Sequence, residues 1–177
     1  MEAGTHKLGP EDSTLRVRTA RKGAAAKAGH DLVIEVTSWS ATLELADEPA
    51  QSSLGLDADA GSLRVREGTG GVMELGDDDR SEIEKNIDDE VLGRQPIEFR
   101  STSVEGDGER LRVRGDLTLV GRSDPIEFDL RLGDDGAIRG SATLRQSDWG
   151  IKPYTALFGA LKVADEVEVE VEGQANA

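Results

Sequence analysis

The chain has 177 residues, which is the size of one domain that can bury a full core without disulfide or metal staples. The absence of cysteine excludes disulfides and thiolate chemistry, and two histidines are too few for the usual histidine-built zinc site. A formal net charge of −15 argues against binding to nucleic acid and to anionic membrane surfaces, because like charges repel.

The N-terminal residues 1–12 are polar apart from Leu8 and predict a mobile tail, in which we expect His6 to be inert. This segment lacks the apolar stretch of a secretory signal peptide and begins with Met1, so we expect a cytoplasmic protein. No run approaches the roughly 18 apolar residues that cross a bilayer, so the sequence predicts no transmembrane segment.

Alternating apolar and polar residues begin at about Ser13 and predict half-buried β-strands in the first part of the chain. Successive strand residues point to opposite faces, so the apolar side chains of one run share a face. The apolar positions of these runs are Leu15, Val17, Leu32, Ile34, Val36, Trp39, Ala41, Leu43, Leu45, Leu54, Leu56, Leu63 and Val65.

The alternation stops after the first five runs, and a different period replaces it. Ile83, Ile87 and Val91 recur every four residues, which predicts one amphipathic helix at about 79–92, ending near Gly93. The acidic run 77–79 suits a helix N-terminus and supplies an N-cap. Capping explains this run without a metal ion.

Alternation returns in the second half of the chain, with turn signals at 106–108, 123–125 and 133–136. Eight or more strands at short spacing predict an all-β fold with one helix, in a single domain over 13–177. Charged residues make up 32% of the chain, and we expect them on a solvated outer wall, because antiparallel sheets tolerate one wet face. The inward positions are Ile97, Phe99, Leu111, Val113, Gly115, Leu117, Leu119, Ile126, Phe128, Leu130, Leu132, Ile138, Gly140, Ala142, Leu144, Val167, Val169 and Val171.

The segment 147–162 differs from the rest in composition. It holds three of the six aromatic residues, and it has no charge between Lys152 and Lys162. Such a segment is either a plug over one end of the sheet or the lid or wall of an apolar pocket.

Catalytic motifs are missing from the sequence. His30 and Asp31 are adjacent at the start of a predicted strand, so their side chains point to opposite faces, and we expect a structural hydrogen bond for His30. No Gly-x-Ser-x-Gly elbow and no His-Glu-x-x-His motif occurs. We therefore predict no catalytic residue, no metal site and no cofactor.

Four segments occur in an order that carries a family resemblance. They are Gly-His-Asp-Leu at 29–32, Pro-Ile-Glu-Phe-Arg-Ser at 96–101, Val-Arg-Gly-Asp-Leu-Thr-Leu-Val-Gly at 113–121 and Asp-Trp-Gly-Ile at 148–151. Together they resemble the YceI-like family of lipid- or polyisoprenoid-binding proteins, over about 13–173. Trp149 stands where that family more often has phenylalanine.

The resemblance implies a lipocalin-like antiparallel β-barrel with one helix, which holds a long isoprenoid or similar lipid tail inside. Members of the family often form dimers, so a homodimer is a candidate assembly. Many members are periplasmic, whereas the lack of a leader in this sequence favours the cytoplasm.

The residues support such a barrel independently. About eight strands close a barrel just wide enough for packed side chains or one slim ligand. Gly115, Gly140 and Ala142 interrupt the inward stripes and leave room, unless larger neighbours fill it. We expect the ligand to be an isoprenoid, quinone, fatty acid or amide. The expected lining residues are Ile34, Leu43, Phe99, Leu117, Leu119, Phe128 and Leu144, and the expected mouth residues are Trp149, Tyr154, Leu157 and Phe158.

Two other functions compete with this interpretation. A barrel with a filled core would act as a structural or interaction protein through its outer surface. An isomerase or hydrolase would need an ionisable group inside the cavity, such as His30 or Asp148.

Overall fold

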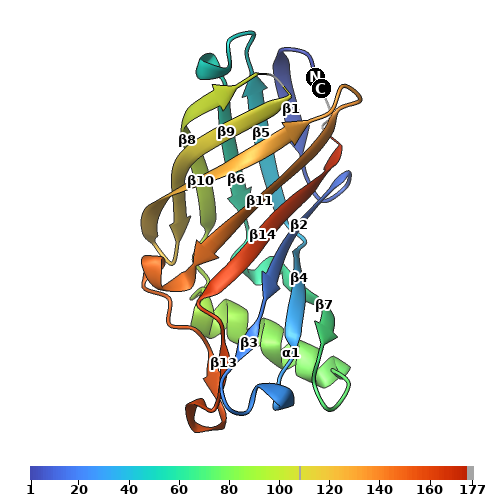
Figure 1. The fold of residues 1–177 in the computed structure, drawn as a ribbon, viewed down its shortest axis with the longest axis vertical. Helices are drawn as coiled ribbons and strands as arrows, with labels where there is room; N and C mark the ends of the chain where they lie inside the picture. The colour runs from blue at the N-terminus through green and yellow to red at the C-terminus, as the bar shows by residue number, and fades with distance from the viewer. Residues whose placement is uncertain (108, 175–177) are drawn as a thin grey trace.

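The computed structural model describes residues 1–107 and 109–174. It consists of one large antiparallel sheet, one α-helix and a small three-stranded sheet (Figure 1). The strands of the large sheet are β1 (Gly4–Leu8), β2 (Ser13–Thr19), β4 (Asp31–Val36), β5 (Trp39–Leu45), β6 (Ser53–Ala58), β7 (Leu63–Thr69), β8 (Ile97–Gly106), β9 (Arg110–Leu119), β10 (Arg122–Leu132), β11 (Ala137–Arg145) and β14 (Glu166–Gln174). The small sheet consists of β3 (Arg21–Lys22), β12 (Thr155–Ala156) and β13 (Leu161–Val163), and the helix is α1 (Asp77–Asn86).

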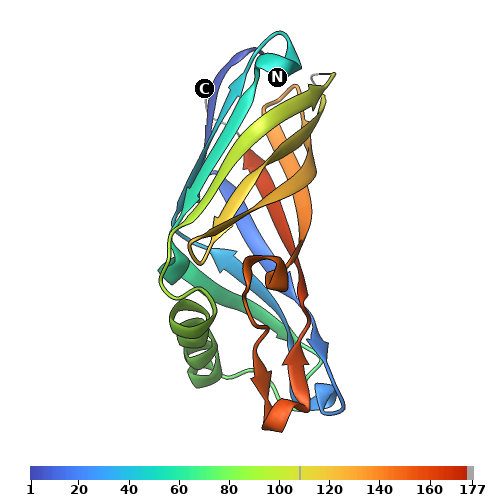
Figure 2. The ribbon, with the colours of Figure 1, turned by 90° about the vertical axis from the view of Figure 1, so that its left-hand side faces the viewer.

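The large sheet has eleven described strands, in the spatial order β1-β5-β6-β8-β9-β10-β11-β14-β2-β4-β7. It curls into a half-barrel whose two edges are β1 and β7 (Figure 2). The all-β antiparallel architecture with one helix is confirmed. The predicted number of about eight strands is too low, partly because strands as short as β1 show too little alternation to be recognised in the sequence.

The predicted N-terminal tail is wrong. Residues 4–8 form β1, which pairs with β5 in antiparallel register, with His6 opposite Leu43. His6 and Leu8 are both buried, and the Nε2 atom of His6 lies 2.8 Å from the carbonyl oxygen of Glu2. The segment looks like a tail in sequence because only these two positions face the core.

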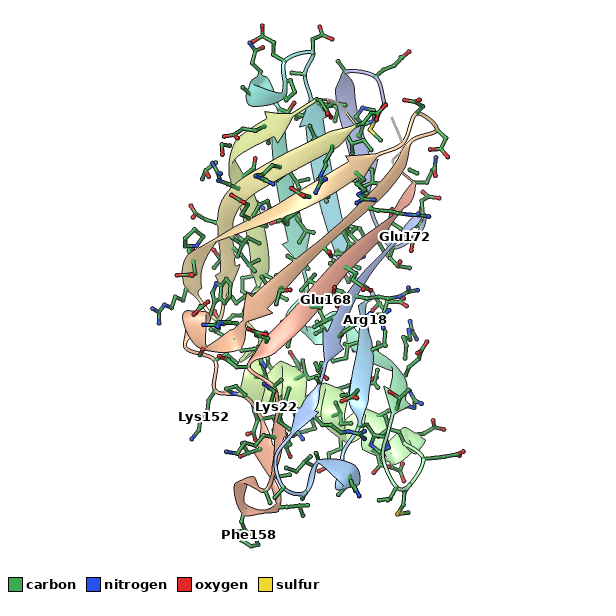
Figure 3. The ribbon with its side chains drawn as sticks, in the orientation of Figure 1. Arg18, Lys22, Lys152, Phe158, Glu168 and Glu172 are labelled. Carbon is green, nitrogen blue, oxygen red and sulfur yellow. The ribbon has the colours of Figure 1, made fainter. Side chains whose placement is uncertain are left out.

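The predicted alternation matches the burial of side chains along the strands. In β5 the inward residues Trp39, Ala41, Leu43 and Leu45 are all buried, whereas Ser40 and Glu44 are exposed. The outer face is a charged wall of cross-strand pairs, seen in Figure 3 around Arg18, Glu168 and Glu172. One such pair joins the Nε atom of Arg18 to Glu170 at 2.9 Å.

The helix begins at Asp77, two residues before its predicted start. Its N-cap is Gly76 rather than an aspartate, and the Oδ2 atom of Asp79 accepts a hydrogen bond from the Gly76 backbone N–H at 3.0 Å. A π-helical turn, Ile87–Val91, continues the helix, and Gly93, with φ of 57°, follows its end as predicted. The N-cap position differs because a carboxylate in the first turn satisfies the same N–H group from inside the helix.

The turn predicted at 123–125 is also misplaced. The β9–β10 turn lies at Val120 and Gly121, which have φ angles of 48° and 73°. Pro125 lies within β10, opposite Asp116 of β9. This half of β10 is not paired with β11, whose register begins at Asp129, so the missing N–H of proline costs no ladder hydrogen bond. The 133–136 turn is confirmed, and the 106–108 turn includes Gly108, which lies outside the described residues.

The unusual segment 147–162 leaves the large sheet and builds the small one. After a short helical turn, Gln146–Trp149, the chain forms β12 and β13, and β13 pairs with β3. Figures 1 and 2 show this hairpin extending past the large sheet, at the end where α1 lies. The N-terminus and the end of β14 lie at the opposite end (Figure 1).

Candidate ligand cavity

The half-barrel encloses a cavity of about 720 Å³. Its wall is mainly Leu, Ile, Val and Ala, and most strands of the large sheet contribute to it. Pockets that hold small molecules typically measure roughly 300–1,000 Å³, so the cavity has room for a ligand of that size.

Most of the residues expected to hold a ligand lie on this wall. The seven predicted lining residues and Tyr154 all border the cavity; they are Ile34, Leu43, Phe99, Leu117, Leu119, Phe128, Leu144 and Tyr154. Phe99 and Phe128 also contact each other, with ring centroids 5.4 Å apart and planes tilted by 57°. Trp149, Leu157 and Phe158 are not part of the described lining.

Trp149 acts as a plug rather than as part of the mouth. Its side chain is buried, and its indole Nε1 donates a hydrogen bond to the carbonyl oxygen of Leu117 at 2.7 Å. It therefore fastens the start of the 147–162 segment to strand β9. Other residues of that segment, among them Ile151, Tyr154 and Leu161, border the cavity, so the segment also contributes to the wall.

Leu157 and Phe158 project away from the cavity. Both have left-handed backbone conformations, with φ angles of 50° and 55°, and both side chains are exposed. Figure 3 shows Phe158 at the far tip of the hairpin, pointing out of the molecule. Their place outside the lining follows from the tight turn between β12 and β13, which sequence periodicity does not reveal.

Two of the three positions expected to leave room are filled by neighbours. A Cβ atom at Gly115 would lie 2.5 Å from the ring of Phe99, and one at Gly140 would lie 2.5 Å from Cδ2 of Leu130. These glycines admit close packing of larger side chains. Gly140 nevertheless borders the cavity, as does Ala142.

The cavity opens at the end formed by α1 and the small sheet. Apart from Ser141 on β11, the exposed residues of its described lining all belong to that end: Ala28, Met73, Glu74, Asp79, Glu82, Tyr154 and Lys162. The ionisable lining residues lie there too, with Arg21 and His30. Among the described residues, the wall contributed by the eleven strands carries no ionisable side chain.

His30 lies at this mouth and makes the structural hydrogen bond that the sequence predicts. Its Nε2 atom is 2.7 Å from the carbonyl oxygen of Met73. Asp31 instead accepts a hydrogen bond from the backbone N–H of Arg21, at 2.8 Å. The two neighbouring side chains therefore have separate partners and do not form a histidine–carboxylate pair.

The helix supplies a part of the wall that sequence reasoning left out. Ile83, Ile87 and Val91 predict the helix correctly, and in the structure all three border the cavity. The available signal was the apolar stripe itself. An amphipathic helix must bury that stripe, and an open barrel end offers a surface for it.

A hydrogen-bonded carboxylate is among the contacts that anchor the segment that leads to the small sheet. Asp165 accepts hydrogen bonds from the hydroxyl of Ser147 at 2.5 Å and from its backbone N–H at 2.9 Å. These two bonds, the hydroxyl first, lower the pKa of Asp165 below its ordinary value. The carboxylate form therefore holds the two ends of the 147–165 excursion together.

None of the described helices is both long and apolar enough to span a bilayer. The signature of the YceI-like domain matches residues 7–175. This chain belongs to the YceI-like family. The family signature begins inside β1, which agrees with a folded N-terminal strand rather than a tail.

Individual relatives match either a short part of the chain or most of it at low sequence identity. A UPF0312 protein of Pseudomonas aeruginosa is 38% identical over 63 residues, which are 30% of this chain and 33% of that protein, so the match spans a third of the relative's length. The crystal structure of Burkholderia cenocepacia BcnA has a TM-score of 0.69 at 15% identity, and covers 93% of this chain and 96% of its own. The crystal structure of a Campylobacter jejuni YCEI protein has a TM-score of 0.60 at 16% identity, and covers 81% of this chain and 84% of its own. At these identities the two structures establish the shared fold.

Proposed function

We propose that this protein binds one hydrophobic small molecule with a long apolar chain, such as an isoprenoid or quinone, and does no chemistry on it. The observation that supports this proposal is the cavity of about 720 Å³ where a small barrel would otherwise have its packed core. Membership in the YceI-like family agrees with a binding role.

The distribution of polar groups suggests how such a ligand would lie. The wall built by the eleven strands is apolar apart from Thr19 and Ser141, and burial of a chain there contributes about 0.8 kcal/mol per methylene. The polar groups are at the mouth, where Arg21, Tyr154 and Lys162 offer donors to a head group. The apolar chain would therefore lie inside and the head group at the mouth.

The first test is native mass spectrometry of freshly purified protein, followed by solvent extraction and identification of the released compound. We expect a discrete added mass that corresponds to a long-chain apolar molecule. A bare protein mass, with no uptake when isoprenoids, quinones and fatty acids are offered, would contradict the proposal. A structural role through the outer surface would then explain the fold better.

A matched pair of variants on one strand links the bound mass to the cavity. Ala142→Phe places a ring inside the cavity, whereas Thr143→Phe places it on the exposed outer face of β11. We expect the first variant to lose the added mass and the second to keep it. Equal ligand content in the two variants would show that the ligand lies elsewhere.

A further inference from the structure

Large apolar side chains that face solvent gather at one end of the molecule. Among the described residues they are Val72, Met73, Tyr154, Leu157 and Phe158, and Phe158 has a relative exposure of 112%. They belong to two loops, at 70–73 and at 154–158, and the connection 23–28 between β3 and β4 lies between them. The backbone N–H of Ala25 donates to Ala160 at 2.9 Å, and that of Val72 donates to Lys27 at 3.2 Å.

We call these three connected segments, residues 22–28, 70–73 and 152–162, the distal end. Phe158 forms its tip (Figure 3). Leucine and phenylalanine rarely occupy left-handed backbone conformations, yet Leu157 and Phe158 do so in succession, before Gly159 at φ of 84°. This turn points two large apolar side chains outward, although burial would stabilise them. Strained residues of this kind cluster at functional sites.

The charge of the distal end is opposite to that of the whole chain. Residues 20–29 and 149–164 contain Arg21, Lys22, Lys27, Lys152 and Lys162 and no aspartate or glutamate. Four of the six lysines in the chain are therefore at this end, in a protein of net charge −15. Figure 3 shows Lys22 and Lys152 in the same lower part of the molecule as Phe158, back from the tip and at about the level of α1.

Acidic residues border this end on several sides. The Oδ1 atom of Asp31 lies 3.8 Å from Nε of Arg21, and Asp165 interacts electrostatically with Lys22. Further acidic residues follow the 70–73 loop. Glu74 and the aspartates at the start of α1 lie there, and Figure 2 shows α1 set back from the tip of the hairpin. The carboxylates of the charged outer wall lie along the strands of the barrel (Figure 3). Potentials of exposed charges decay within about 8 Å at physiological ionic strength, so the local charge decides what this surface attracts.

We propose that the distal end docks on an anionic lipid bilayer, with Leu157 and Phe158 inserted between the head groups and the lysines on lipid phosphates. Exposed apolar side chains near flexible cations are a combination that favours interfacial membrane binding. Lysine stems also bury well at such a boundary while their ammonium groups stay solvated. The net charge argues against anionic membranes only as an average over the whole surface.

Docking in this orientation would place the cavity mouth against the bilayer. Tyr154 and Lys162 belong both to the distal end and to the lining of the mouth. A ligand could then pass between bilayer and cavity without crossing water. This exchange step rests on the proposed function, whereas the docking itself does not.

The test is vesicle flotation of the whole protein, with phosphatidylcholine vesicles that contain or lack phosphatidylglycerol at about 30 mol%, a strongly anionic surface. We expect binding to the anionic vesicles that weakens as salt rises, and little binding to the neutral ones. The double variant Leu157→Asn and Phe158→Asn should bind at least about tenfold more weakly, because it removes both inserted side chains. Asparagine tolerates left-handed backbone, so this variant should fold.

A second pair of variants tests the charge. Lys22→Gln with Lys152→Gln should weaken binding and flatten its salt dependence. Lys7→Gln with Lys85→Gln removes the two lysines outside the distal end and should change nothing. Failure of the wild-type protein to float with anionic vesicles would overturn the proposal, as would equal binding by all variants. Loss of a dimer in the Leu157→Asn and Phe158→Asn variant, without vesicle binding by wild type, would identify a self-association surface instead.

Ligand content separates this proposal from the previous one. The distal-end variants should still carry the added mass in native mass spectrometry, because Leu157, Phe158, Lys22 and Lys152 lie outside the described cavity lining. Ala142→Phe should bind vesicles normally and carry no ligand. If wild type binds vesicles but never holds a ligand, the docking surface stands and the carrier function fails.

Discussion

The two tryptophans of this chain are buried to a similar degree but differ in their hydrogen bonding. Trp149 donates to the Leu117 carbonyl at 2.7 Å, whereas the Nε1 atom of Trp39 has no partner among the described residues. A buried donor without a partner costs free energy, and a buried donor with one contributes to stability. The two indoles therefore play different parts in the same core.

Replacing each tryptophan by phenylalanine should reveal this difference. We expect Trp149→Phe to lower the free energy of unfolding by about 1–2 kcal/mol more than Trp39→Phe does, because only Trp149→Phe removes a buried hydrogen bond. Urea unfolding of both variants measures the two losses. Equal losses would mean that volume, and not the indole N–H, decides the stability at both positions.

At the scale of elements, β1 shows how a strand can be hidden in a polar sequence. Only His6 and Leu8 face the core, so the segment carries too few apolar residues for the alternation to stand out. Pairing with β5 supplies the backbone hydrogen bonds that hold it. A long-range partner, rather than local sequence, makes this segment a strand.

Truncation of one side chain tests whether β1 is folded. Leu8→Ala should lower the free energy of unfolding by about 2–3 kcal/mol, because it removes a buried side chain from the core. Lys7→Ala, on the exposed face of the same strand, should change it by no more than about 0.5 kcal/mol. Denaturant unfolding curves provide both values. A negligible effect of Leu8→Ala would support the tail after all.

One anchor of the excursion that carries the small sheet is Asp165, whose pKa is lowered by the hydroxyl and backbone N–H of Ser147. A carboxyl group whose pKa is lower in the folded than in the unfolded state stabilises the folded protein. This stabilisation is fully present above the unfolded-state pKa of about 3.9, and it is lost as the pH falls through the folded-state pKa. Asp165→Asn should therefore be less stable than wild type at pH 7, and the difference should shrink below about pH 4.

Urea unfolding at several pH values measures this difference. The comparison variant is Asp148→Asn, an exposed neighbour of Ser147, for which we expect a change within about 0.5 kcal/mol. A deficit in Asp165→Asn that is the same at pH 7 and at pH 3 would show that packing, and not ionisation, makes this contact important.

At the scale of the whole molecule, polarity changes along the long axis. The barrel is charged outside and apolar inside. The distal end holds the cavity mouth, the exposed apolar residues and four lysines. This division makes the net charge a poor guide to what the distal end contacts. It also places entry to the cavity at one end of the fold.

A bound ligand should raise the stability of the whole molecule. Protein stripped by solvent extraction and then loaded with the compound identified by mass spectrometry should unfold at a higher temperature than the stripped protein, since a ligand at 100 times its Kd contributes about 2.7 kcal/mol. Ala142→Phe should show no such shift, because its cavity is filled. Differential scanning calorimetry measures both. A similar shift in wild type and variant would place the binding site outside the cavity.

The order of residues alone determined the antiparallel strands, the inward face of each and the helix over most of its length, because these depend on side-chain periodicity within a few residues. Of the eleven site residues expected from the sequence, eight border the cavity, because the apolar stripe of each strand must face the interior. Only the tertiary structure decided that Phe99 packs across Gly115, that Trp149 plugs the sheet and that Phe158 faces solvent. Cavity volume, hydrogen-bond partners and the direction of a strained turn depend on which distant segments meet, and periodicity along the chain carries no record of that.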